Sequence, residues 1–462
     1  MSTPRPDRPD PVTDPATRPL TPRSGWPPVP MADPAADRAT ATADAPPAPP
    51  APGQSPPPGE APVRRGRRLA VLTGRARAVV GRWPWWLQVG LVYALSRLVT
   101  AGVFLAVARQ QGANPWGPAQ PGYGPFINFW DSAWYQRIFD QGYPSAIPRN
   151  PDGSAQANPW AFYAVFPFLV RGLAAVTGLG WTTLASTVAV VAGLGAVLVI
   201  HRLFRLVAGP GDSLAAVALI CLFPVSAVLQ IPYAESLHLL LLAAGLYLLA
   251  RHRYLAAAPV VVAMCLTRPA GLPFALLVAV HLLLRWRSGD FPWAERVRGL
   301  VLLAVATAGG WAWPVIAWLV TGEVRAYTDT ETAWRGGGLV LFAPWFDTGR
   351  WLFGPVFGPV TVVTVGVVVA AALLSRPVRR LGTDLQGWCL CYALYLAAVL
   401  QPQTSTFRLL LPLFPLALAA VFVSRSRAYR ITLGVAFFAL QIVWVAWLWR
   451  FSELPGGGDY PP

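Results

Sequence analysis

The sequence contains no lysine and carries little charge of either sign. All 37 of its basic residues are arginines, and charged residues occupy only 13% of the 462 positions. A nucleic-acid-binding protein would need a basic face on a soluble module, and none is visible in the sequence. Most arginines instead flank apolar runs, where positive charge sets membrane topology and attracts anionic lipid. The formal net charge of +16 is therefore explained by membrane topology, and we predict no nucleic-acid partner.

Cysteine is also scarce, and the sequence contains no recognisable metal-binding or nucleotide-binding motif. The four cysteines, Cys221, Cys265, Cys389 and Cys391, lie inside apolar segments, where a free thiol behaves as a small hydrophobic residue. A disulfide framework or a zinc site would need loop cysteines at ligand spacing. The run "RGGGLV" lacks a Walker lysine, and neither an HExxH motif nor a Ser/His/Asp set is found. We expect no metal and no cofactor.

Long apolar runs make up most of the chain. It is 55% hydrophobic, and apolar runs of about 15 to 24 residues recur from Trp85 onward, as in polytopic helical membrane proteins. The sequence therefore predicts an all-α membrane domain over residues 85–450. Twelve segments are candidate spans: Trp85–Ala108, Ala161–Leu179, Thr182–Leu206, Leu214–Ile231, Ser236–Ala250, Tyr254–Thr267, Ala270–Leu284, Gly299–Val320, Trp351–Leu374, Leu385–Leu400, Phe407–Val423 and Ile431–Trp449.

The positions of the arginines reduce this number to eleven. If all twelve segments crossed, five basic clusters in succession would face outside, against the positive-inside rule. The segment Ala161–Leu179 carries Arg171 and Pro167, so we interpret it as a juxtamembrane or re-entrant helix. Eleven transmembrane helices then place the N-terminus inside and the C-terminus outside. The five clusters that move inside are His201/Arg202/Arg205, Arg251/Arg253, Arg285/Arg287, Arg376/Arg379/Arg380 and Arg425/Arg427/Arg430.

The ends of the chain differ from the membrane domain. Residues 1–62 are rich in Pro, Ala, Asp and Thr and cannot bury enough apolar surface to offset the entropy of ordering, so we predict a disordered cytoplasmic tail. The arginine-rich residues 63–84 are predicted to be a basic juxtamembrane segment, and residues 451–462 a short outer tail. With this topology the outer side has two long loops, 109–180 and 321–350, which are rich in aromatic residues. Long loops of this kind are commonly functional.

The first outer loop contains the stretch "FWDSAWYQRIFDQGYP", which sets two carboxylates among aromatic residues. Asp131 lies between Trp130 and Trp134, and a carboxylate held in such a lowered dielectric is a candidate general base. The structural alternative is a solvated loop residue or a helix N-cap. Asp140 is the second candidate acid, although a turn or cap role before Gly142 competes with it.

Charged residues at the outer ends of predicted spans form a second group. Arg268 in "LTRPAG" and Arg408 in "STFRLLLPLFP" are candidates for a phosphate pocket, because arginine binds phosphate through two parallel hydrogen bonds. Snorkelling to lipid headgroups is the alternative. Glu235 in "IPYAESLHL" is either a site residue or an acid favoured by the helix dipole.

These motifs together resemble a known family. "WDSAWYQRIFDQGY" with "WAFYAVFPFLVR" is similar to the first-loop signature of integral membrane mannosyltransferases related to the second mannosyltransferase of glycosylphosphatidylinositol-anchor synthesis, in the glycosyltransferase-C superfamily. "FPVSAVLQIPYAESLHLLLL", "LTRPAG", "AYTDTETAWRGG" and "FRLLLPLFPLALA" resemble later blocks in the same order. The resemblance covers about Trp85 to Trp449.

The resemblance implies an inverting transfer of mannose from a polyprenyl-phosphate donor, without a nucleotide. Asp131 would be the base, and Arg408 and Arg268 would bind the donor phosphate. The other expected substrate-binding residues are Trp130, Trp134, Tyr135, Glu235, Trp334 and Arg335. The arginine-rich, lysine-free composition fits a bacterium of high genomic G+C content, which implies the cell membrane with the active site on its extracytoplasmic face. The expected partners are the lipid-linked sugar and membrane lipid, while the acceptor, a glycan, glycolipid or protein, stays open.

Two alternatives remain at this stage. The same fold could use another lipid-linked sugar, such as arabinose or glucose, because fold resemblance does not fix the substrate. A lipid or sugar transporter without bond chemistry is the other alternative. It would favour charged residues near mid-membrane and an internal repeat, whereas the unusual charges here gather at one face.

Overall fold

The computed structural model describes residues 83–335, 338 and 340–453, and these are helical apart from loops and two isolated β-bridges. The predicted tail 1–62, nearly all of the segment 63–84 and most of 451–462 lie outside the described residues, so those predictions are untested. The helices are α2 (Trp85–Ala108), α3 (Tyr123–Ile127), α4 (Asp131–Gln141), α5 (Val165–Thr177), α6 (Trp181–Phe204), α7 (Pro210–Leu222), α8 (Glu235–Ala250), α9 (Tyr254–Cys265), α10 (Gly271–Arg287), α11 (Trp293–Thr321), α12 (Ala326–Arg335), α13 (Ala343–Leu373), α14 (Arg376–Arg379), α15 (Thr383–Val399), α16 (Thr406–Leu409), α17 (Pro415–Val423) and α18 (Arg427–Val443), with the 3₁₀ turns η1 (Pro159–Ala161), η2 (Ser226–Gln230) and η3 (Leu411–Leu413) and the π-helical turn η4 (Trp444–Trp449).

Among the described residues, five helices are long and apolar enough to cross a membrane. They are α2, α6, α11, α13 and the continuous helix formed by α18 and η4, and the bent pair Thr406–Leu413 and Pro415–Val423 would make a sixth. This is the architecture of a multi-pass membrane protein. Eleven spans, with the N-terminus inside and the C-terminus outside, stay a prediction.

Proline and glycine account for where predicted spans are interrupted. The predicted segment Leu214–Ile231 is not one helix, because α7 ends at Leu222 just before Pro224 and the chain continues into η2. The predicted segment Phe407–Val423 is bent by 74° between its two parts, where Pro412 and Pro415 remove backbone donors.

Helix α5 occupies the segment expected not to cross. Its 13 residues span about 20 Å, which is shorter than the roughly 30 Å hydrocarbon core of a bilayer. Its Arg171 guanidinium donates to the carbonyl oxygens of Phe139 (2.5 Å) and Ile138 (3.2 Å) at the end of α4. The first predicted outer loop therefore folds as a packed helix pair, α4 and α5, joined by an arginine contact.

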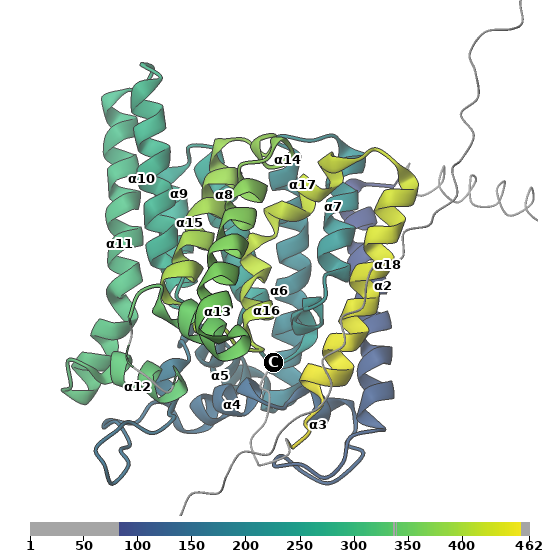
Figure 1. Cartoon of the computed structure of the whole chain (residues 1–462), viewed down its shortest axis with the longest axis vertical. Helices are drawn as coiled ribbons and strands as arrows, with labels where there is room; N and C mark the ends of the chain where they lie inside the picture. The colour runs from purple at the N-terminus through teal and green to yellow at the C-terminus, as the bar shows by residue number, and fades with distance from the viewer. Residues whose placement is uncertain (1–82, 336–337, 339, 454–462) are drawn as a thin grey trace, which may run out of the picture. The chain divides into compact units, whose positions relative to one another are not determined.

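Four of the short helices lie together at one end of the long ones (Figure 1). In Figure 1, α3, α4, α5 and α12 lie at the lower end, whereas the arginine-containing α14 lies at the upper end. Segments assigned to the outer side by charge alone thus lie together, and a predicted inner segment lies opposite them.

The charge pattern makes a topology prediction that reporter fusions can test. Because each basic cluster should stay in the cytoplasm, fusions after the five clusters should report cytoplasm, and a fusion after Tyr460 should report the outside. An outside signal after the first cluster combined with an inside signal at Tyr460 would contradict the assignment, because Ala161–Leu179 would then cross. The five fusion points are Arg205, Arg253, Arg287, Arg380 and Arg427.

A close glycine contact fixes the turn between α9 and α10. A Cβ added to Gly271 would lie 2.5 Å from the Cα of Gly310 on α11, which is far inside van der Waals contact. Gly271→Ala should therefore push α10 away from α11 and destabilise the fold by about 1–3 kcal/mol, as overpacking does. Thermal unfolding of the purified protein should show a lowered midpoint. Gly366→Ala on α13 is the matched control, because nothing lies within 4 Å of its added Cβ, and equal midpoints for the two variants would contradict the prediction.

Candidate active site

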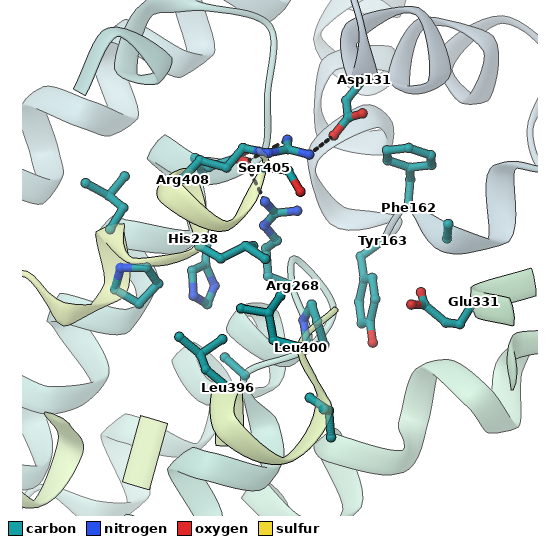
Figure 2. Close-up of a pocket in the computed structure, with 18 of the residues that line it drawn as sticks. Asp131, Phe162, Tyr163, His238, Arg268, Glu331, Leu396, Leu400, Ser405 and Arg408 are labelled. Carbon is teal, nitrogen blue, oxygen red and sulfur yellow. Dashed lines mark hydrogen bonds and ion pairs between the residues drawn. The ribbon is translucent and has the colours of Figure 1, made fainter. Parts of the chain in front are cut away.

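A cavity of about 230 Å³ lies where α4, α8, the α9–α10 turn, α12, α15 and α16 meet. Charged side chains from sequence positions far apart face it, as Figure 2 shows for Asp131, Arg268, Glu331 and Arg408. Of the residues expected from the sequence, these line it: Asp131, Tyr135, Glu235, Arg268, Trp334, Arg335 and Arg408. Their assembly defines a polar chamber at the end of a bundle of apolar helices.

Asp131 is the first residue of α4, and an unusual backbone conformation at the preceding residue sets its position. The preceding Trp130 has φ 59° and ψ −127°, a conformation that costs a non-glycine residue about 1–3 kcal/mol. The Trp130 indole N–H donates to the carbonyl oxygen of Trp449 at 2.7 Å, and the Asp131 N–H donates to the Tyr233 hydroxyl at 3.1 Å. With the start of α4 held by these two contacts, Asp131 lines the cavity.

The Asp131 carboxylate forms an ion pair with the Arg408 guanidinium. Both side chains are largely buried, with exposed fractions of 13% and 10%. The Arg408 guanidinium also lies over the Tyr233 ring, 5.2 Å from its centroid, so Tyr233 supports both members of the pair. Because it is buried and paired, Asp131 is not a solvated loop residue in the structure, and Arg408 does not extend to the lipid headgroups.

Glu235 joins Arg408 to Arg268. Its Oε1 accepts from the Arg408 guanidinium at 3.2 Å and also pairs with the Arg268 guanidinium. Glu235 is the first residue of α8, so the helix dipole also favours its negative charge there. A single carboxylate therefore holds two guanidinium groups close together that would otherwise repel each other.

Some buried polar atoms of this cluster have no partner within the described protein. They are Glu235 Oε2, Arg408 Nε and, one turn along α8, His238 Nδ1. Buried polar groups are normally hydrogen-bonded, so such atoms require an explanation. A ligand with acceptor oxygens and hydroxyl donors in the cavity would satisfy them.

Three residues expected at the site are not among those that line the cavity. The Trp130 indole N–H donates to the Trp449 carbonyl oxygen, and Trp134 stacks on Phe162 with ring centroids 5.9 Å apart. Phe162 itself lines the cavity, so Trp134 supports an aromatic wall from behind. Asp140, near the C-terminal end of α4, is exposed.

Helix α12 brings to the cavity residues that the sequence did not single out. Glu331, Tyr327 and, from the first predicted outer loop, Tyr163 line the cavity. The Tyr163 and Tyr327 hydroxyls are 3.3 Å apart, and Arg335 donates to Glu331 Oε2 at 3.2 Å. Burial raises the pKa of the Glu331 carboxyl, and the charge of Arg335 opposes the shift only in part.

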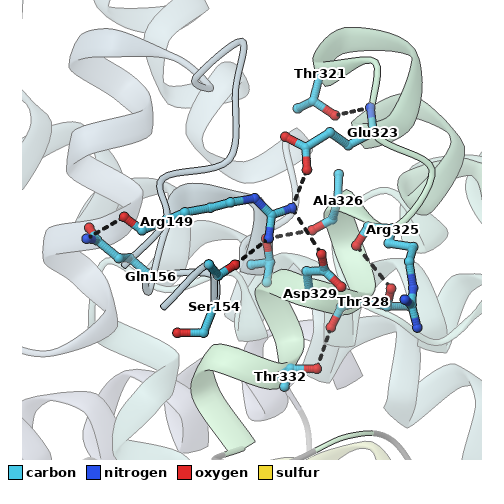
Figure 3. A network of polar contacts seen from close by, with 12 residues as sticks. Arg149, Ser154, Gln156, Thr321, Glu323, Arg325, Ala326, Thr328, Asp329 and Thr332 are labelled. Carbon is cyan, nitrogen blue, oxygen red and sulfur yellow. Dashed lines mark hydrogen bonds and ion pairs between the residues drawn. The ribbon is translucent and has the colours of Figure 1, made fainter. Parts of the chain in front are cut away.

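The two loops that were predicted to be outer, 109–180 and 321–350, are joined by polar contacts. As Figure 3 shows, Arg149 of the first loop pairs with Glu323 and, at 3.1 Å, with Asp329 at the start of α12. Deeper in, the Asn158 side-chain amide donates to the Thr330 hydroxyl at 3.0 Å. The exposed ion pairs contribute little energy, whereas the buried Asn158 contact fixes α12 against the first loop.

The expectation of no metal and no cofactor stays a prediction. Within the described ranges, no group of three or more His, Cys, Asp and Glu side chains could hold a metal ion.

Comparison with known proteins adds a distant likeness. No protein-family model and no curated protein matches the chain. The chain is similar to the oligosaccharyltransferase of Archaeoglobus fulgidus with Zn and sulfate, with a TM-score of 0.42 and 14% identity over 76% of this chain and 53% of that chain. Archaeal oligosaccharyltransferase AglB from the same organism, in complex with an inhibitory peptide and a dolichol-phosphate, gives 0.39 and 12% over 77% and 56%.

The chain thus spans about half the length of the solved structures it matches. At such TM-scores the likeness establishes neither a shared fold nor a shared activity.

Proposed function

We propose that this protein is an integral membrane glycosyltransferase that moves a mannosyl residue from a polyprenyl-phosphate donor to an acceptor at the outer face. The observation that carries the proposal is the cavity in which Asp131 meets Arg268 and Arg408, residues from three separate segments. A carboxylate and a pair of guanidinium groups are the two components that transfer from a phosphate leaving group needs. The structure supplies them within one chamber.

The bond changes balance without any further reactant. An acceptor hydroxyl oxygen forms a bond to the anomeric carbon of the donor sugar, and the bond from that carbon to the phosphate oxygen breaks. The leaving phosphate keeps the bonding electrons, and Asp131 takes the proton of the attacking hydroxyl. A single displacement of this kind inverts the configuration at the anomeric carbon.

Arg268 and Arg408 stabilise the charge that develops on the leaving phosphate. Cations already held in place act without reorganisation at the moment of reaction, which makes them effective in a water-poor site. Glu235 contacts both guanidinium groups, so it positions the cation pair.

The aromatic wall limits the competing reaction with water. Phe162, Tyr135 and Trp334 line the cavity, and such rings can pack against a sugar while excluding solvent, which protects the donor from hydrolysis. Mannose as the sugar, the bacterial cell membrane as the location and the extracytoplasmic side as the working face follow from the sequence resemblance and the charge pattern, and they form part of this proposal.

Transfer from labelled lipid donors tests the proposal directly. Membrane vesicles prepared from the protein's own host cells, so that the acceptor is present, are incubated separately with polyprenyl-phosphate mannose, glucose and arabinose, and the glycosylated products are identified. We expect transfer with mannose. Transfer with glucose or arabinose alone would keep the enzyme class and change the sugar. Movement of lipid or sugar across the vesicle without any glycosylated product would favour the transporter alternative.

A further inference from the structure

The proposed function uses one side of the cavity and leaves the other without a role. Asp131, Arg268 and Arg408 lie on the side formed by α4, the α9–α10 turn and α16. Across the cavity, Figure 2 shows Glu331 on α12 with its carboxyl group directed toward Tyr163. We call the four residues Tyr163, Tyr327, Glu331 and Tyr395 the α12 lobe, and all four line the cavity.

The chemistry of the α12 lobe differs from that of the arginine side. It presents one carboxyl group and three phenol hydroxyls. The nearest cation, Arg335, is already engaged by Glu331 at 3.2 Å and by the Val399 carbonyl oxygen at 2.7 Å. The four residues of the lobe carry no positive charge of their own with which to bind a phosphate. Carboxyl and phenol groups instead exchange hydrogen bonds with neutral hydroxyl groups.

The lobe is also rigidly built. The Tyr163 ring stacks on Trp313 with centroids 5.1 Å apart, and its hydroxyl meets that of Tyr327. The indole of Trp313 in turn donates to the Trp160 carbonyl oxygen at 2.9 Å. Side chains fixed in this way lose little entropy when a ligand binds, as expected of a subsite that recognises a particular arrangement of hydroxyls.

We infer that the α12 lobe is the subsite that holds the donor's sugar ring, with Glu331 hydrogen-bonding its hydroxyl groups while Arg268 and Arg408 hold the phosphate. This inference rests on the proposed function and adds a specificity-determining residue to it. The Glu331 carboxyl group lines the cavity together with the paired Tyr163 and Tyr327 hydroxyls, and such groups can exchange hydrogen bonds with several hydroxyls of one sugar ring.

The test compares two ligands that differ only in the sugar. Binding of polyprenyl-phosphate mannose and of bare polyprenyl phosphate is measured for purified full-length wild-type protein, Glu331→Ala, Glu331→Gln and the control Asp347→Ala, which removes an acid with an exposed fraction of 68%. Glu331→Ala should lose about 10- to 100-fold in affinity for the sugar-bearing donor, as loss of hydrogen bonds to one such group predicts. It should keep wild-type affinity for the bare lipid phosphate.

Glu331→Gln should retain most of the sugar-dependent affinity and of the turnover, because an amide still donates and accepts. Equal losses for both ligands in Glu331→Ala, or no loss for either, would overturn the inference. A drop in turnover for Glu331→Gln as deep as that for Asp131→Asn would also overturn it, since Glu331 would then be acting on a proton.

Failure of the proposed function gives a different result. If wild-type protein binds neither lipid, the donor assignment itself is wrong. Binding of a methyl hexoside at millimolar concentration then tests the lobe without the lipid. Saturable binding to wild type that is lost in Glu331→Ala would support a sugar subsite, and absence of such binding would refute it.

Discussion

Asp131→Asn should reduce turnover by about 10²–10⁴-fold, the usual range for loss of a general base. An amide keeps the size of the side chain and can still bond to Arg408, but it cannot take the proton of the acceptor hydroxyl. Arg408 keeps its contact with Glu235, so its buried charge stays compensated and the protein should still fold. Single-turnover transfer from labelled donor in vesicles gives the rate, and thermal unfolding confirms that the variant is intact.

Asp140→Asn is the matched control for this experiment. It is the same substitution on the same helix, but Asp140 is exposed and outside the cavity lining. Its turnover should stay close to that of wild type. Near wild-type turnover for Asp131→Asn, in a direct transfer assay, would end the assignment of Asp131 as the base and reopen the transporter alternative.

Arg408→Lys should lower donor affinity by about 10- to 100-fold although the charge is kept. Lysine is a point charge and cannot make the parallel hydrogen bonds that a guanidinium makes to a phosphate. Charge-assisted hydrogen bonds of this kind contribute roughly 1.5–3 kcal/mol. In the structure Arg408 reaches Asp131 and Glu235 through two different nitrogens, a fork that an ammonium group cannot reproduce. Titration of the purified variant with fluorescent polyprenyl-phosphate mannose measures the loss.

Arg350→Lys on α13 serves as the control, because that arginine is half exposed and pairs only with Asp347 among the described contacts. It should bind donor as tightly as wild type. Unchanged donor affinity in Arg408→Lys would mean that the pair with Asp131 is a structural contact and that the phosphate binds elsewhere.

Much of the helical framework could be predicted from apolar periodicity and length. The segment Trp85–Ala108 was expected with the same bounds that α2 has, since no proline or glycine pair interrupts it. Prediction was weakest where a proline interrupts or bends the helix inside an apolar run, as at Pro224 and Pro412. Hydropathy does not record that proline lacks a backbone hydrogen-bond donor. A window average treats such a run as one span.

The residues of the candidate site were likewise only partly predictable from the sequence. Arg268 and Arg408 stood out in the sequence because arginine is unusual at the predicted outer ends of spans. Asp131 stood out because it lies among aromatic residues. The pairing of these residues could not be foreseen, since it depends on how α4 and α16 are packed. Glu331 escaped notice because it lies in the polar stretch "YTDTETAWR", where Asp329 is an equally plausible acid. Only the packing of α12 against the first loop turns one of them toward the cavity and the other toward Arg149.

The ion pair between Asp131 and Arg408 sets a sequence of events under the proposed function. Asp131 and the donor phosphate would both bind the guanidinium group of Arg408. The Asp131 carboxylate is therefore released from this ion pair only when the phosphate takes its place. An acceptor that arrives first meets a carboxylate whose charge is already matched and gains no activation from it. Initial-rate kinetics should accordingly follow a compulsory order, with the lipid-linked sugar adding before the acceptor.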